Sequence, residues 1–367
     1  MTGKWNSLGN QPWGRPSFFV ACRVAGVAVS ALFLSAVAAH SQTVPAEMQE
    51  ALAAEFHFSP ADLTRAESGK VIAKMVPTGK PDDVRMAGVV LIRVSSADFI
   101  RAFRDIEHFA IGKEVRHTER FSSPPVEADF AGYHLPDLNK DELFACHPGS
   151  CAYKMPAQAM EDLRTRIDWT APDANARAEA LVHKMMIEHL IDYQQRGDAA
   201  LSVYYDTRAP YSVAEGLHSL IGGETLLWNR HPDLLRYAEH YPNDAPAGVE
   251  NLFYWQEAAF GLKHIIRVQH VIIQKLPQPS EDAHYAIISK MLLASHYFRA
   301  AIEFNYVYPV RTASGEPAVY FVAAQRSYVD GLTGAKGAIL RKIAEGRSPA
   351  SLAANLELAK HKLEGEK

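Results

Sequence analysis

The sequence contains only three cysteines and no long run of basic residues, and neither an internal repeat nor a low-complexity segment is visible. Its 367 residues carry a formal net charge of −4, so acidic and basic side chains nearly balance. Without a strongly basic patch, nucleic acid is not an expected partner. Hydrophobic residues make up 48% of the chain and charged residues 22%, which excludes wholesale disorder and a protein with many membrane spans. The chain is long enough to bury a core in one large domain or two ordinary ones.

Several catalytic motifs are also missing. No G-x-S-x-G nucleophile elbow occurs, which argues against a serine hydrolase. His183 and His189 lie six residues apart in a helical segment, so they diverge by about 120° around the helix. Zinc-protease helices instead place two histidines four residues apart, on one face. No pair of acidic residues marks a glycosidase. The sequence therefore predicts neither a metal site nor a cofactor.

The first 41 residues have the layout of a secretory signal. Residues 1–23 contain three basic residues and no acidic one, and residues 24–39 form an uncharged run. This run is short for a membrane span, which usually needs about 20 residues. An A-x-A-like rule fits cleavage after Ala38 or after Ser41. We predict a signal peptide over residues 1–41 and an exported protein, periplasmic or secreted, that begins near Gln42.

Two cysteines, Cys146 and Cys151, follow this segment. An even number of cysteines in an exported chain indicates a disulfide, and the Pro148-Gly149 pair between them favours a turn that brings the two sulfurs together. A redox pair or haem attachment would need C-x-x-C, and zinc would need more thiols or a suitable set of histidines. We predict a structural Cys146–Cys151 disulfide that closes a surface loop.

Hydrophobic periodicity divides the chain after the signal into three parts. Residues 42–110 contain a short helix and linker, two strands and a helix, predicted at 45–68, 70–76, 84–94 and 97–109. Residues 111–240 contain an irregular stretch and then helices, predicted at 111–155, 156–169, 174–195, 213–220 and 232–240. Residues 241–367 contain five strands of an antiparallel meander and two helical segments, predicted at 252–255, 265–273, 285–293, 302–310, 319–328, 337–343 and 351–364.

This order of segments resembles the helix-grip arrangement of the START-like superfamily. The resemblance rests on residues 87–100, on the strands between Leu252 and Tyr328, and on Asp330-Gly331-Leu332 before the terminal helix. Residues 294–298 are also similar to a group of uncharacterised exported bacterial proteins. The resemblance implies an α+β fold in which a curved antiparallel sheet grips a C-terminal helix, with residues 111–240 as a helical insertion. It also implies an apolar cavity between sheet and helix for lipids or other hydrophobic ligands.

His270 is the first candidate for a ligand-binding residue. It lies on one face of a predicted strand, between Val268 and Ile272. The resemblance places this face against the C-terminal helix, so we expect His270, with Trp255 and Tyr297, to line an internal pocket. Burial would keep the imidazole neutral at pH 7. The alternative is a core histidine that satisfies buried polar groups.

The other candidates, among them His296, Arg326 and Tyr328, lie near strand ends. His296 and Tyr297 follow a predicted strand, and Ser295 precedes them, but neighbouring strand residues point to opposite faces and so do not form a nucleophile–base pair. Arg326 and Tyr328 share one face of the last strand. An arginine inside the curved sheet would bind a carboxylate or phosphate head group, whereas one outside would be solvated.

Three interpretations follow. The first is an exported, cofactor-free protein that binds a hydrophobic small molecule or lipid, with peripheral membrane contact as a further partner. The second is a periplasmic enzyme in which His270 or His296 is the acid–base group of the same cavity. The third is an envelope interaction protein that docks through its helical insertion. A cavity lined mostly by carbon would favour the first, several convergent titratable groups the second, and a large exposed apolar patch the third.

Overall fold

The computed structural model describes residues 44–112, 114–135, 138–223, 230–259, 263–276, 283–332 and 334–365. The predicted signal peptide, residues 1–41, lies outside these ranges. The described residues all belong to one compact unit, residues 40–367.

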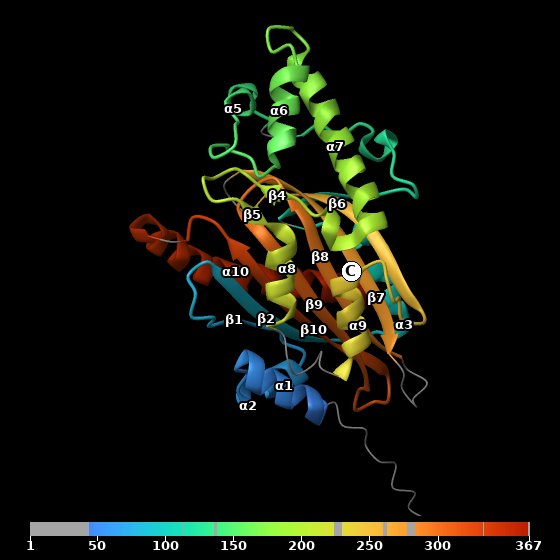
Figure 1. Ribbon diagram of the computed structural model, residues 1–367. Coiled ribbons are helices and arrows are strands. Elements are labelled where there is room, and N and C mark those ends of the chain that lie inside the picture. Colours follow the sequence, from blue (N-terminus) through green and yellow to red (C-terminus); the bar gives the residue numbers. More distant parts are fainter. Residues whose placement is uncertain are drawn as a thin grey trace, which may run out of the picture. The chain divides into compact units, whose positions relative to one another are not determined.

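An antiparallel sheet of eight strands forms the centre of this unit (Figure 1), so the fold is α+β, as predicted. The strands are ordered β1-β2-β10-β9-β8-β7-β6-β3 across the sheet. Their bounds are β1 Ile72–Val76, β2 Asp83–Ile92, β3 Val115–Arg120, β6 Val249–Ala259, β7 His264–Leu276, β8 His284–Ala294, β9 Phe298–Arg311 and β10 Pro317–Val329. β6 to β10 are sequential neighbours, which confirms the predicted meander.

Helices cover both faces of the sheet because its strands are apolar on both sides. The strand period of two sends Val268 and Ile272 of β7 into one core and Val271 and Ile273 into another. The first core contains residues of α1 (Ala46–Phe56), α7 (Ala174–Arg196), α8 (Val213–Ile221) and α9 (Pro232–His240). The second contains residues of α3 (Ser96–Arg104), α4 (Ile106–Phe109) and α10 (Gly334–Glu364). Figure 1 is viewed from the α8 and α9 side, with α10 behind.

The remaining elements are short. They are α2 (Pro60–Glu67), η1 (Glu127–Phe130), α5 (Lys140–Phe144), α6 (Ala157–Arg166), η2 (Gly197–Ala200), β4 (Val203–Tyr204) and β5 (Tyr211–Ser212). The side chain of Ser95 accepts a hydrogen bond from the Asp98 N–H and so caps α3.

Two expected elements differ in the structure. Residues 111–155 are not irregular throughout, because β3 pairs with β6 at the sheet edge and η1 and α5 follow. The predicted helices at 337–343 and 351–364 are one continuous α10, which passes through Pro349. The local sequence does not indicate β3, because most of its residues are polar or charged. Its pairing with β6 depends on residues far away in the chain.

Among the helices of the described residues, none combines the length and the apolar character that a membrane crossing requires.

Candidate functional site

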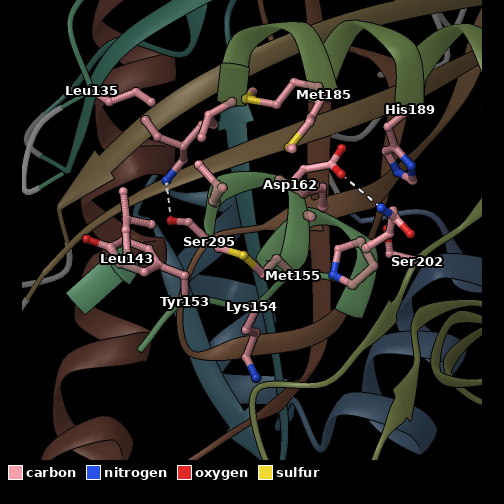
Figure 2. A pocket seen from close by; sticks show the side chains of 18 of the residues that line it. Leu135, Leu143, Tyr153, Lys154, Met155, Asp162, Met185, His189, Ser202 and Ser295 are labelled. Atoms are coloured by element: carbon pink, nitrogen blue, oxygen red, sulfur yellow. Dashed lines mark hydrogen bonds between the residues drawn. The ribbon is translucent and has the colours of Figure 1, made fainter. Parts of the chain in front are cut away.

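A cavity lies between the sheet and helices α5, α6 and α7, and we call it the insertion cavity. Its volume is about 400 Å³. Figure 2 shows side chains that line it, with Met185 and His189 projecting from α7 and Ser295 on the sheet side. Its apolar lining consists of Leu135, Leu138, Leu143, Met155, Pro156, Ala159, Leu163, Val182, Met185, Met186, Ile266 and Leu293.

Helix α7, which is amphipathic, forms one wall of this cavity. Leu190 and Tyr193 of this helix are fully buried in the core of the sheet. Met185 and Met186, one to two turns earlier, line the cavity, and Met186 also belongs to the core of the sheet. Methionine is flexible and polarisable, so it fits a cavity wall that must adapt to different ligand shapes.

The opposite wall is a loop that three backbone contacts fix to its neighbours. The Lys154 N–H donates to the Ser295 carbonyl at 2.8 Å, beyond the end of β8. The N–H groups of Gly149 and Cys151 donate to Tyr205 and Asp206 at 2.7 and 3.0 Å. The Cys146–Cys151 disulfide, which the structure contains as predicted, closes the turn before this wall.

Lys154 is the cation that lines this cavity, and its charge is compensated. Its side chain is buried, and its ammonium pairs with Asp206 at 3.1 Å and with Asp330. Two carboxylates offset the cost of removing one ammonium from water. Lys154 therefore holds the wall in place.

His189 has the one ring nitrogen of the cavity that remains without a partner in the described structure. Its Nε2 atom is buried without a hydrogen-bond partner among the described residues. Burial lowers the pKa of His189 below its ordinary value, so the ring is neutral at pH 7.

Other polar groups at the cavity are occupied by the protein itself. The Ser295 hydroxyl accepts from the Ile266 N–H at 3.0 Å, and Nδ1 of His296 bonds to the Ala152 carbonyl at 3.0 Å. The Tyr153 hydroxyl accepts from the Asn139 N–H at 3.0 Å. The pair Ser295 and His296 is thus not arranged as nucleophile and base, as strand alternation predicts. Within the described ranges, no cluster of three histidine, cysteine or acidic side chains could hold a metal ion.

His270 lies on the sheet face opposite to the one we expected. Its Nδ1 bonds to the Tyr193 hydroxyl of α7 at 2.9 Å, and its Nε2 to Oδ1 of Asn251 at 2.8 Å. Asn251 in turn donates to the Tyr237 hydroxyl at 2.9 Å. The expected contact with the terminal helix is wrong, because the β7 register turns His270 toward α7. Burial, reinforced by the positive charge of Lys290, lowers the pKa of His270 well below its ordinary value.

The other candidates occupy separate places, and only His296 lines the insertion cavity. Trp255 is buried and donates to the Asp129 carbonyl at 3.1 Å. The Tyr297 hydroxyl accepts from the Lys263 N–H at 3.0 Å. Tyr328 bonds to the Ser219 hydroxyl at 2.9 Å. The structure therefore does not gather the predicted residues around one pocket.

Arg326 is paired within the protein. Its Nε and Nη2 atoms donate to the two carboxylate oxygens of Asp83 at 3.0 and 2.8 Å. Such a bidentate pair is the geometry in which arginine binds carboxylates best. Arg326 thus ties β10 to the start of β2 through a carboxylate of the protein itself.

A second, smaller cavity lies between the sheet and α10, and we call it the terminal-helix cavity. Its volume is about 140 Å³. The sheet contributes a row of polar side chains to it, namely Gln256, Arg267, Gln269, Ser289, Glu303, Asn305 and Gln325. Burial raises the pKa of Glu303, while Arg267 and the amides of Asn305 and Gln325 oppose that rise. An apolar cavity was expected here, and the floor is instead polar.

The sequence signal for the insertion cavity was present but incomplete. Apolar residues recur along α7 at helical spacing, and this pattern indicates a buried face without showing what it faces. His189 was considered only as a metal ligand. Met155 and Leu143 lie in the stretch predicted as irregular, where no periodicity points to a wall.

A comparison with models of known protein families finds no match, and no curated protein matches the chain.

Proposed function

We propose that the protein is an exported binding protein for a hydrophobic small molecule or lipid, which it holds in the insertion cavity. The observation that supports this proposal is the cavity itself, about 400 Å³ in volume and lined largely by leucine, methionine and other carbon-rich side chains. Small-molecule sites typically measure about 300–1,000 Å³ and combine an apolar lining with a few placed polar groups. His189 is such a group.

Catalysis and docking have less support. The titratable groups of the cavity do not converge, because His296 and Lys154 point to partners within the protein. The large hydrophobic side chains that are exposed in the described part of the chain are Val126, Phe144 and Val203, which come from three separate segments. Isolated apolar side chains are ordinary on a surface, whereas a docking face needs a contiguous patch.

Export is part of the proposal and rests on the basic start and uncharged run of residues 1–39, together with the Cys146–Cys151 disulfide. Edman sequencing of protein purified from its native envelope should give a mature N-terminus near Gln42. Recovery of intact residues 1–41 would contradict cleavage.

We also propose that the sheet and α10 form a helix-grip arrangement of the START-like type. The support is the chain order β2, α3, α4, β3, then β6 to β10 and α10, combined with the sheet order β2-β10-β9-β8-β7-β6-β3. On this proposal, residues between β3 and β6 are an insertion that covers the face opposite to α10.

Ligand binding can be tested in two steps. Mass spectrometry of organic extracts from the purified protein should identify a co-purifying hydrophobic molecule. Titration with the fluorescent apolar probe N-phenyl-1-naphthylamine should then give saturable binding that the extracted molecule displaces. The absence of saturable probe binding by delipidated protein would overturn the proposal.

A variant that fills the cavity tests whether the probe binds there. Ala159 of α6 lines the cavity, so A159W should fill it and weaken probe binding at least about tenfold, equivalent to about 1.4 kcal/mol. Ala180 is exposed on α7, and A180W is the matched control that should leave probe binding unchanged. Equal affinity in A159W and the control would place the probe elsewhere.

A further inference from the structure

The terminal-helix cavity has a polar floor on a sheet face that otherwise belongs to a hydrophobic core. We propose that this cavity is a second binding site, for a small zwitterion such as a free amino acid. The carboxylate of the ligand binds Arg267, and its ammonium group binds Glu303. The site is separate from the insertion cavity, so the inference does not depend on the proposed function.

The strand register places the polar side chains of the floor side by side. Arg267 of β7 pairs with Gln256 of β6. Glu303 of β9 pairs with Ser289 of β8 and with Gln325 of β10. Residues that pair directly across antiparallel strands lie on one face, with Cβ atoms about 4.5–5.5 Å apart. The floor is therefore a polar surface that crosses the strands from β6 to β10.

A floor that served packing alone would be apolar, because burying polar side chains costs free energy. Further along the same face of β7, Val271 and Ile273 are apolar and fully buried. Arg267, Glu303 and Gln325 are instead half-buried, and all three line the cavity. Their accessible surface is within reach of a molecule that enters it.

The guanidinium of Arg267 is oriented by a neutral neighbour. Its Nε donates to Oε1 of Gln256 at 3.0 Å, and Nε2 of Gln269 donates to the same oxygen at 3.3 Å. Gln256 is itself fixed, since its Nε2 donates to the Thr118 hydroxyl at 3.1 Å. The bond to Gln256 uses one of five N–H donors and does not compensate the positive charge. The planar fork of an arginine matches a carboxylate, so Arg267 suits the acidic end of the ligand.

Glu303 suits the basic end of the ligand. Burial raises the pKa of Glu303, and the positive charge of Arg267 opposes this rise without cancelling it. The ionised carboxylate would therefore gain from a further positive charge, which a ligand ammonium group supplies. Among the described residues that line the cavity, Arg267 and Glu303 are the basic and the acidic one. A ligand with one charge of each sign matches them.

The size of the cavity and its access to solvent also fit a free amino acid. Its volume of about 140 Å³ is below the roughly 300–1,000 Å³ of sites for drug-sized molecules. Asn355 of α10 lines the cavity and is exposed, so the cavity reaches the surface beside this helix. Phe103 and Leu352, which also line it, offer apolar contacts to an aliphatic side chain.

The test compares three small molecules by isothermal titration calorimetry of the purified protein at pH 7. They are L-alanine, propionate, which lacks the ammonium group, and ethylammonium, which lacks the carboxylate. Wild-type protein should bind L-alanine at least about tenfold more tightly than either of the others, because only L-alanine meets both charged side chains. L-alanine should not displace N-phenyl-1-naphthylamine, which we assign to the insertion cavity.

Two variants separate the two charges. In E303Q, L-alanine should lose its preference over propionate, and in R267M it should lose its preference over ethylammonium. A third variant tests the location of the site. Ala110, after α4, lines the cavity and is half-buried, so A110W should block it and abolish binding of L-alanine. Ala354 is exposed on α10 and does not line the cavity, so A354W is the matched control that should bind as wild type does.

Three results would overturn the inference. The first is binding of propionate or ethylammonium to wild-type protein as tightly as L-alanine, or no binding of L-alanine at all. The second is an unchanged preference in folded E303Q and R267M. The third is equal affinity for L-alanine in A110W and A354W, which decides the location even if a charge variant fails to fold.

Discussion

At the scale of single residues, His270 was a candidate for ligand binding, but in the structure its imidazole bonds to other side chains of the protein. Tyr193 and Asn251 satisfy both of its nitrogens, and this requires Nε2 to donate to the Asn251 oxygen and Nδ1 to accept from the Tyr193 hydroxyl. The ring is neutral and fully buried. His189 differs, since it lines the insertion cavity and its Nε2 atom has no hydrogen-bond partner in the described part of the chain.

His270→Phe should therefore destabilise the protein by about 1–3 kcal/mol, because it leaves Tyr193 and Asn251 without their partner. Urea unfolding of wild type and variant measures this difference. Binding of N-phenyl-1-naphthylamine to the folded variant should be unchanged, since His270 does not line the insertion cavity. Weaker probe binding without a loss of stability would restore His270 as a ligand-binding residue.

At the scale of elements, α10 approaches β2 so closely that one position of the strand has no room for a side chain. A Cβ atom on Gly88 would lie 2.5 Å from Cδ1 of Leu356 and 3.2 Å from the carbonyl oxygen of Ile72. The first contact could relax by a rotation of Leu356, but the second involves backbone of the paired strand β1. The glycine thus sets the distance between helix and sheet.

Gly88→Ala should destabilise the protein by about 1–3 kcal/mol through overpacking. Leu356→Ala alone should also destabilise it, by about 2–5 kcal/mol, because Leu356 is buried. The double variant should be more stable than the sum of the two losses, since removing the leucine gives the new methyl group space. Strict additivity in a double-mutant cycle would show that α10 does not approach β2 in this way.

The Cys146–Cys151 turn is a second element that can be tested. On the loop-entropy model, a ring this short contributes about 2 kcal/mol. Reduction should lower the free energy of unfolding by roughly that amount and leave the sheet folded, because the turn lies in a small separate core with Leu143 and Leu163. Peptide mapping under non-reducing conditions should find the two cysteines linked. Two free thiols would contradict the disulfide.

At the scale of the whole molecule, several buried or half-buried histidines lie among the elements that pack on the α7 side of the sheet. Burial lowers the pKa of His183, His189, His231 and His270. In the unfolded chain each would titrate near pH 6.5. Below that pH the unfolded state binds protons that the folded state does not, so unfolding becomes more favourable as the pH falls.

The free energy of unfolding should accordingly decrease between pH 7 and pH 5, and urea titrations at several pH values measure the slope. His270→Phe removes one of these groups, so its slope should be smaller than that of wild type. A slope that is flat in wild type, or identical in the variant, would show that these histidines become protonated without unfolding.

Much of the architecture was predictable because it is encoded in neighbouring residues. Hydrophobic residues that recur with a period of two predicted all five strands of the meander. A period of 3.6 predicted α7, α8 and α9 to within a few residues. The Pro148-Gly149 turn between two cysteines indicated the disulfide. These features depend on contacts made within a few residues of chain, so the sequence by itself determined them.

The tertiary structure decided which face each strand presents to which helix. His270 turned toward α7, Arg326 found Asp83, and the loop before α6 became a cavity wall through partners more than fifty residues away. A strand with apolar residues on both faces fits either orientation locally. The choice is made by the packing of all helices on the sheet at once, and that is why the location of the cavity could not be inferred from periodicity.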